Sequence, residues 1–325
     1  MIDLAHTEPV HAPAPEGVHE WVTRMTSHLT AKEVCAAAEH RFGVLSLVDA
    51  FFENTEGLIE ALRSGSRLGA LSLFTPTPEH GWDAAPLAGQ SVHGALRVWG
   101  EVRLASGAAD GSIAMVRLSE TDERLVWLDH HASGIEPRGA RTAGRRPRGR
   151  APLWLVLDGA TIPETRVSRP VSLAPGGDLY KRLEIYIGMW ALIALEYAGR
   201  SVRALRRAAR TTRCAGHAEA FSASQLVAMD VTEVEIETEL TSAAARRHFA
   251  QAAPHPSALV LALSAARTLA AVTRLANELR DRLGLTLDGG PTDDDAAATL
   301  AHVGGAPMLE NELGRVLLLN HGSAG

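Results

Sequence analysis

A long amphipathic helix at residues 177–213 constrains this chain more than any other sequence feature. It begins at a glycine pair that follows a proline, and apolar side chains recur at spacings of three and four; they are Leu183, Ile187, Trp190, Ala194, Ala198, Val202 and Leu205. Arginines occupy its last turns, where their positive charges interact favourably with the negative end of the helix dipole. The pattern predicts one continuous helix between a strand-rich segment and further helical segments.

The composition is that of a soluble chain with enough apolar material for a core. It has 325 residues, 46% of them hydrophobic, and a net charge of -6. The longest uncharged apolar run, IYIGMWALIAL, is too short to cross a bilayer, and no signal-peptide pattern opens the sequence, so we expect a cytoplasmic protein. Cys35 and Cys214 lie far apart, which disfavours a disulfide scaffold or a zinc site, and we expect no metal.

The order of patterns predicts an α+β chain in four parts. Residues 1–16 hold three prolines and no periodicity, typical of a mobile tail, and residues 17–65 form a short helical domain with a Thr30 to Glu33 capping box. Residues 66–175 carry alternating apolar strands with turn signals between them, which predicts an antiparallel β-barrel. Residues 176–325 predict a four-helix bundle. The arginine-rich stretch 136–150 predicts a solvated, protease-sensitive loop, or a contact for phosphates or a partner.

Several stretches in this order resemble the acyl-CoA dehydrogenase family, from residue 17 onward. LSLFTPTPEHGWDAAPLAG is similar to the family's first barrel segment, and GEVRLASGAADGSIAMVRL to the strand pair that contacts the flavin. WLVLDGATIPETRV resembles the strand that leaves the barrel, and VGGAPMLENELGRVLLL the closing motif. The resemblance implies a small helical domain, a β-barrel and a helical bundle, with FAD as cofactor and an acyl thioester as substrate.

The positions of the family's general base depart from this resemblance. One falls on Gly304 and the other on Lys181, directly before Arg182, which the resemblance makes a substrate-binding residue. Glycine cannot accept a proton, and a lysine ammonium is the wrong protonation state for a base unless it is strongly desolvated. Glu184, further along the same helix, is the one nearby substitute, and a surface carboxylate is the simpler interpretation.

The flavin contacts implied by the resemblance are also reduced. They fall on Thr75 and Thr77 in the first segment, on Leu104, Ala105 and Ser106 in the second, and on Arg213 after the long helix. The Trp-Ile-Thr of the family is replaced by Arg103-Leu104-Ala105. Arg213 has two interpretations, a phosphate contact in a neighbouring subunit or a helix cap.

His130 and His131 form the other group that invites a catalytic interpretation. No Asp-Gly follows them as in acyltransferases, and adjacent strand residues point to opposite faces, so the end of a strand is the simpler explanation.

Three hypotheses about function follow. The first is a short subunit of a heteromeric, flavin-dependent acyl-CoA dehydrogenase of lipid metabolism, without the family's base and associated with a full-length homologue. The second is a stand-alone flavoenzyme of biosynthesis on the same scaffold, and the third is a flavin-free scaffold or binding protein. The helices of residues 176–325 carry more apolar side chains than the core of one small bundle needs, which predicts a homo- or hetero-oligomer. The acidic chain and the lack of aromatic residues in the arginine stretch argue against nucleic acid.

Overall fold

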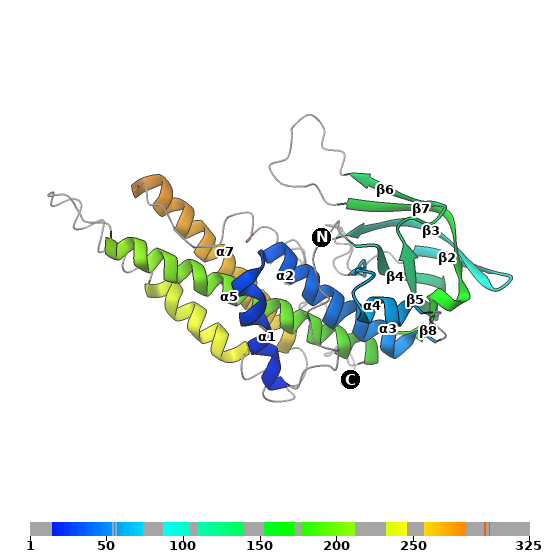
Figure 1. Cartoon of the computed structure of the whole chain (residues 1–325), viewed down its shortest axis with the longest axis horizontal. Coiled ribbons are helices and arrows are strands. Elements are labelled where there is room, and N and C mark those ends of the chain that lie inside the picture. The colour runs from blue at the N-terminus through cyan, green and yellow to red at the C-terminus, as the bar shows by residue number, and fades with distance from the viewer. Residues whose placement is uncertain are drawn as a thin grey trace, which may run out of the picture. The chain divides into compact units, whose positions relative to one another are not determined.

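The structure, a computed structural model, describes residues 15–53, 55, 57–73, 87–104, 109–139, 153–172, 177–211, 232–245 and 257–283, with 296 and 299. It divides into two compact units (Figure 1). Of the described residues, one unit holds 35–186, and the other holds 15–34 together with 187–299. Predictions on six site residues lie outside the described residues; these are Thr75, Thr77, Ala105, Ser106, Arg213 and Gly304.

Short helices precede the sheet, as the periodicity predicts. They are α1 (Pro15–His28), α2 (Ala31–Ala38), a π-helix (Glu39–Val44), α3 (Leu45–Phe51) and α4 (Leu58–Arg63). The capping box is confirmed, because the Thr30 N–H donates to Glu33 Oε2 at 3.0 Å and the Glu33 N–H to Thr30 Oγ1 at 3.4 Å. The sequence did not predict the π-helix, a rare element that often occurs at functional sites.

The first unit contains one mixed sheet. Its strands are β1 (Gly69–Leu71), β2 (Leu87–Val92), β3 (Ala95–Leu104), β4 (Gly111–Ser119), β5 (Asp122–Asp129), β6 (Ile135–Gly139), β7 (Leu153–Pro163) and β8 (Val167–Val171). They pair in the order β6-β7-β3-β2-β4-β5-β8, and β1 also pairs with β4. The edge strands β6 and β8 are far apart (Figure 1).

The expectation of a closed antiparallel barrel is therefore wrong in two respects. The sheet is open among the described strands, and β1 and β2 both pair with β4 in parallel, β1 at its start and β2 at Val116 and Arg117. Alternating apolar residues show that a strand has a buried face, but they carry no information on which strands close a sheet. The two parallel pairings arise because β1 and β2 take successive places along the same edge of β4.

Local backbone geometry explains the tight hairpin between β2 and β3. His93 and Gly94 have φ of 42° and 78°, the left-handed values that a tight two-residue turn between β2 and β3 requires. Glu136, Pro137 and Arg138, expected in a solvated loop, belong instead to β6 and pair with β7. All three side chains are exposed, as suits the edge of a sheet, while residues 140–150 lie outside the described part.

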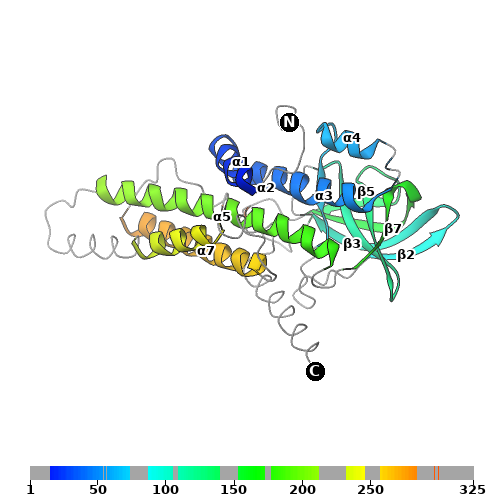
Figure 2. The ribbon, with the colours of Figure 1, turned by 90° about the horizontal axis from the view of Figure 1, so that it is seen from below.

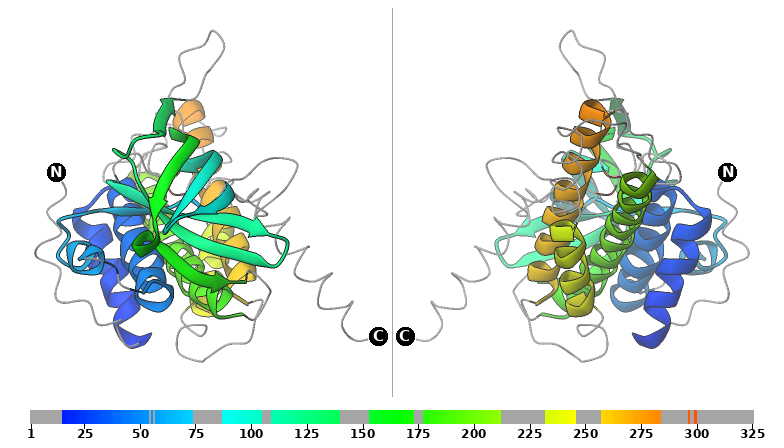
Figure 3. Two further views of the ribbon diagram at one scale, coloured as in Figure 1. Left: turned by 90° about the vertical axis from the view of Figure 1, so that its right-hand side faces the viewer. Right: turned by 90° about the vertical axis from the view of Figure 1, so that its left-hand side faces the viewer.

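The second unit is helical. The predicted long helix is confirmed as α5 (Asp178–Thr211), whose first residues belong to the first unit, and it is followed by a helix at 232–245 and by α7 (Ser257–Leu283). Figure 2 and the right panel of Figure 3 show these three helices side by side. Tyr197 donates to the Leu29 carbonyl at 3.3 Å, and Trp190 Nε1 donates to the Thr299 carbonyl at 2.7 Å. A fourth helix of the bundle stays a prediction, because of residues 284–325 only 296 and 299 are described.

One stretch of α7, Ala258–Glu278, is long and apolar enough by itself to cross a membrane. Of its most apolar window, 56% is buried inside the protein, as in the core helix of a soluble bundle.

Candidate functional site

The first turns of α5 carry the base position that the resemblance implies. Lys181 is exposed, and its backbone N–H donates to the Gly177 carbonyl at 3.0 Å, inside the first turn. Glu184 is half-buried on the same helix. The described structure therefore presents a cation to solvent at the position where the resemblance implies a carboxylate, and the nearest glutamate is partly covered.

Arg182 faces a different set of neighbours. Its Nη1 donates to Ser46 Oγ at 3.2 Å and to the Ser46 carbonyl at 3.3 Å, and its guanidinium lies 5.9 Å from the centre of the Phe51 ring. Arg169 lies 5.4 Å from the same ring centre and donates to the Ala50 carbonyl at 3.4 Å. Arg182 thus bonds to the first turn of α3, Arg169 bonds to its last turn, and both cations lie over the ring of Phe51 at its end. The observed contacts of Arg182 fasten α5 to α3.

Two adjacent ionisable residues of the π-helix are buried and hold β1. Glu39 is 1% exposed, and its Oε1 accepts the Leu71 N–H at 2.8 Å. His40 is 6% exposed, and its Nδ1 accepts the Gly69 N–H at 3.1 Å while its Nε2 lies 3.0 Å from the Leu62 carbonyl. Since a carbonyl can only accept, Nε2 carries the proton. His40 therefore bridges α4 and β1 as a neutral imidazole.

Burial sets the protonation of this pair. It raises the pKa of Glu39 to about 8, against the opposing effect of the Leu71 hydrogen bond, so the carboxyl is protonated at neutral pH. Burial lowers the pKa of His40, opposed by its bond to the Leu62 carbonyl. The pKa of Tyr186 is raised by burial and by the charges of Glu39 and Cys35. Neither Glu39 nor His40 is among the site residues predicted from the sequence, although the ionisable residues inside the otherwise apolar run CAAAEHRFGVL were a usable signal.

A second histidine contact lies where β5 ends, as expected for His130. Its Nδ1 is 2.9 Å from the Ala109 carbonyl and its Nε2 is 3.1 Å from Ser112 Oγ. Burial lowers the pKa of His130, so the ring is neutral near pH 7. Its Nδ1–H donates to the Ala109 carbonyl, and its Nε2 accepts a hydrogen bond from the Ser112 hydroxyl. Ser112 is completely buried, which leaves no access for a substrate and makes the pair a structural link between β4 and β5. Among the described residues no group of His, Cys, Asp and Glu could hold a metal.

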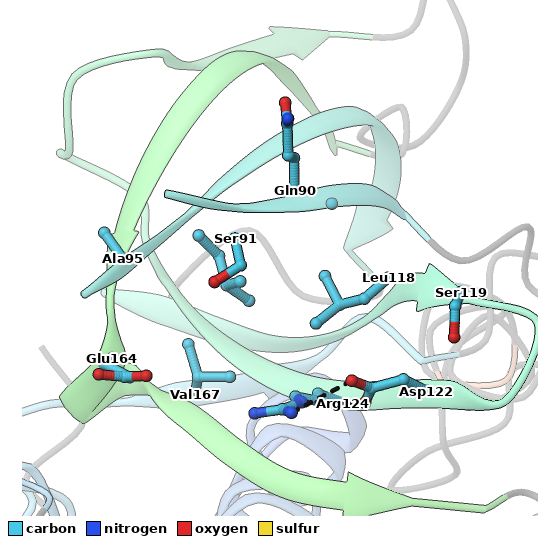
Figure 4. Close-up of a pocket in the computed structure, with 11 residues that line it drawn as sticks. Gln90, Ser91, Ala95, Leu118, Ser119, Asp122, Arg124, Glu164 and Val167 are labelled. Atoms are coloured by element: carbon cyan, nitrogen blue, oxygen red, sulfur yellow. Dashed lines mark hydrogen bonds and ion pairs between the residues drawn. The ribbon is translucent and has the colours of Figure 1, made fainter. Parts of the chain in front are cut away.

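A pocket opens at the end of the sheet formed by the β2–β3 and β4–β5 hairpins. Its volume is about 400 Å³, and its lining comes from β2, β3, β4, β5, β8 and the 3-10 turn Glu164–Arg166. Figure 4 shows Ser91, Leu118 and Val167 around the interior, with the Arg124 and Asp122 pair along one wall and Glu164 beside Val167. Arg124 donates through Nε to Asp122 Oδ1 at 2.9 Å and through Nη2 to Asp122 Oδ2 at 3.1 Å.

The fit to a flavin can be tested on only one of the implied contacts. Leu104 ends β3, is 1% exposed and pairs with Leu153, so its side chain points into the sheet core and only its backbone could reach a ring outside. Leu104, Lys181, Arg182 and Glu184 all belong to the first unit. The other predicted flavin contacts lie outside the described residues.

Comparison with known proteins gives the fold. No family model matches the chain, and no curated protein is significantly similar in sequence. Among solved structures, FkbI, described as acting in biosynthesis of a methoxymalonyl extender unit, is 16% identical with a TM-score of 0.73 over 94% of this chain and 86% of that one.

Two further solved structures are similar to this chain, one described as a dehydrogenase and one as a complex of two proteins. A glutaryl-CoA dehydrogenase from Mycobacterium smegmatis in complex with FADH2 is 14% identical, with a TM-score of 0.71 over 93% of this chain and 86% of that one. A chain of the ChsE4-ChsE5 complex from Mycobacterium tuberculosis is 13% identical, with a TM-score of 0.68 over 96% of this chain and 99% of that one. The chain has the acyl-CoA dehydrogenase fold, as the sequence predicted.

Proposed function

We propose that this chain is a subunit of a heteromeric, flavin-dependent acyl-thioester dehydrogenase and does not itself supply the general base. The observation that carries the proposal is the exposure of Lys181 on α5, at the position where the resemblance implies a general base. An ammonium cannot take the proton alpha to a thioester, and a positioned base typically contributes about a hundred- to ten-thousand-fold in rate.

The likeness to a chain of the ChsE4-ChsE5 complex supports a subunit role, because that solved structure is described as a complex of two proteins. This likeness extends over 96% of the present chain, with a TM-score of 0.68. It suits an assembly in which a full-length homologue completes the site. We place this complex in the cytoplasm.

The residues proposed to contact the cofactor are those that the resemblance implies. Backbone groups from Leu104 to Ser106 and the side chains of Thr75 and Thr77 would face FAD, and Arg213 would reach a flavin held in a neighbouring subunit. FAD, when bound, accepts the hydride from the beta carbon of the substrate. Arg182 is the candidate substrate ligand, although its observed partners are Ser46 and Phe51.

The test compares the chain alone with the chain co-expressed beside a full-length acyl-CoA dehydrogenase homologue from the same genome. We expect a dimer or tetramer alone with little flavin absorbance, and a co-purifying complex with a full flavin spectrum. A strictly monomeric chain in sedimentation, or one that purifies alone with full FAD, contradicts the proposal.

Two variants at one position test the missing base. In the flavin-loaded complex, Lys181→Glu supplies a carboxylate and should raise acyl-CoA dehydrogenation, whereas Lys181→Met removes the charge without supplying a base and should not. Strong dehydrogenation by the unmodified single chain would count against the proposal, and its loss in Glu184→Gln would then identify Glu184 as the base.

The likeness to FkbI favours one alternative, a stand-alone biosynthetic flavoenzyme. The two candidates differ in the single chain: flavin bound without a partner favours the biosynthetic enzyme. A chain without flavin in either preparation favours a scaffold or binding protein.

A further inference from the structure

The pocket between the β2–β3 and β4–β5 hairpins is separate from the contacts used above. It lies at the start of β3, at Ala95 and Leu96, whereas the flavin contacts follow Leu104 at the end of the same strand. At the usual rise per residue, the two ends of β3 are about 30 Å apart. A ligand in this pocket would therefore be a second ligand of the protein.

One wall of the pocket has hydrogen-bonding capacity that the residues described in the structure do not use up. A guanidinium has five N–H donors, and Asp122 takes two of those of Arg124, at 2.9 and 3.1 Å. Asp122 and Arg124 are each 30% exposed, so the pair is held in place but reachable from the pocket. The bidentate geometry fixes the plane of the guanidinium.

Glu164 supplies the matching acceptor on the same wall. Its carboxylate is exposed, and its negative charge attracts the Arg124 guanidinium without a hydrogen bond. Within the described residues, the ion pair of Arg124 is with Asp122. Val167 lies beside Glu164 and Arg124 in the pocket lining (Figure 4). Donor and acceptor thus stand near each other without a direct bond between them.

The rest of the lining is apolar or weakly polar. Leu96 and Val167 are buried, Leu118 is half-buried, and Ser91 adds one hydroxyl. The volume of about 400 Å³ is within the range of small-molecule pockets, about 300 to 1,000 Å³. The ligand must therefore be small, with one apolar portion and one portion that bears both a donor and an acceptor.

We propose that this pocket binds a small zwitterion, an α-amino acid with an aliphatic side chain. Its carboxylate accepts hydrogen bonds from Arg124, its ammonium donates to Glu164, and its side chain contacts Leu96, Leu118 and Val167. A simple anion is disfavoured, because Asp122 and Glu164 outnumber Arg124. A simple cation leaves the remaining Arg124 donors without an acceptor on the ligand.

The experiment is a calorimetric titration of the full chain with four probes at low salt. L-leucine carries both charges, leucinamide lacks the carboxylate, N-acetyl-leucine lacks the ammonium, and inorganic phosphate tests the anion. We expect saturable binding of leucine, with each singly charged analogue weaker by about tenfold or more, since a hydrogen bond to a charged group contributes about that much.

Variants place the binding in the pocket. Glu164→Gln removes the ammonium partner from an exposed position and should weaken leucine by about tenfold without affecting the fold. Ser91→Phe fills the interior and should abolish binding, while Glu101→Gln, the same chemical change at an exposed site of β3 outside the lining, should change nothing. Far-UV circular dichroism checks that each variant is folded.

Four results overturn the proposal. Leucinamide binding as tightly as leucine would show that Arg124 takes no part, and phosphate binding better than leucine would identify an anion site. Failure of every probe to bind, or leucine binding unchanged by both Glu164→Gln and Ser91→Phe, would exclude an amino acid in this pocket.

Discussion

The buried carboxyl of Glu39 makes a quantitative prediction about stability. Burial raises its pKa from the usual 4.5 to about 8, so between these two values the folded chain holds a proton that the unfolded chain has lost. Stability therefore falls as pH rises through this window, because the folded state binds more protons than the unfolded state. The contribution is complete below pH 4.5 and is lost as pH rises to about 8.

The magnitude follows from the width of the window. Each pH unit corresponds to about 1.4 kcal/mol, so the whole interval has an upper limit of about 5 kcal/mol. Between pH 5.5 and 7.5 we expect the free energy of unfolding to fall by about 1 to 3 kcal/mol on account of Glu39 alone. The groups near it are His40 on the π-helix, Cys35 on α2 and Tyr186 on α5. The raised pKa of Tyr186 keeps that phenol neutral in this range, and the lowered pKa of His40 favours its neutral form.

The perturbation is Glu39→Gln. A glutamine keeps the shape and the acceptor for the Leu71 N–H but cannot ionise, so it imitates the protonated acid at every pH. The free energy of unfolding by urea, measured at half-unit steps from pH 5 to 8, should be similar for the two proteins near pH 5. At higher pH the variant should be the more stable protein. The difference in free energy of unfolding between the two should grow by about 1 to 3 kcal/mol from pH 5.5 to pH 7.5.

The control is Glu60→Gln, the same change at an exposed position of α4. Its pH profile should be parallel to that of the unmodified protein. If the Glu39→Gln profile is also parallel, Glu39 titrates alike in both states and the argument from burial is wrong. A parallel profile at lower stability would show in addition that the carboxyl contributes through packing.

Three further changes test other parts of the structure. Gly111→Ala should destabilise by about 2 kcal/mol or more in chemical denaturation, because an added Cβ would overlap the Trp127 ring and come within 2.7 Å of the Leu128 carbonyl oxygen. Gly199→Ala in α5 should stabilise by about 0.5 to 1 kcal/mol, since its new methyl meets only the flexible end of Arg203 at 3.4 Å; a loss of stability would refute the assigned helix. Arg182→Met keeps the aliphatic stem but loses the Ser46 bonds and the Phe51 contact, so thermal unfolding should show a loss of stability of about 1 to 2 kcal/mol. Adding Ser46→Ala to this variant should cause little further loss. An additive effect of the two changes would show that Arg182 acts elsewhere.

Local sequence signals predicted the long helix and the start of α2, although not the π-helix. The spacing of Leu183, Ile187 and Trp190 predicts α5, and the Thr30 and Glu33 pair predicts the start of α2, because both signals act within a few residues of one chain. The order of helical, strand-rich and helical segments was enough to indicate the acyl-CoA dehydrogenase fold, although the identity to the solved structures reported above is 13 to 16%.

Tertiary structure alone decided how the strands pair and which polar side chains meet. The parallel pairing of β1 and β2 with β4 and the open edges at β6 and β8 depend on contacts between distant residues, which alternation does not encode. The same holds for the sites. Arg182 reaches Ser46 across 136 positions and Glu39 reaches Leu71 across 32, and Arg124 and Glu164 meet at one pocket only because β5 and the end of β7 meet there. Residue type gave each side chain its chemistry, and packing decided whether that chemistry faces solvent, a backbone amide or a ligand.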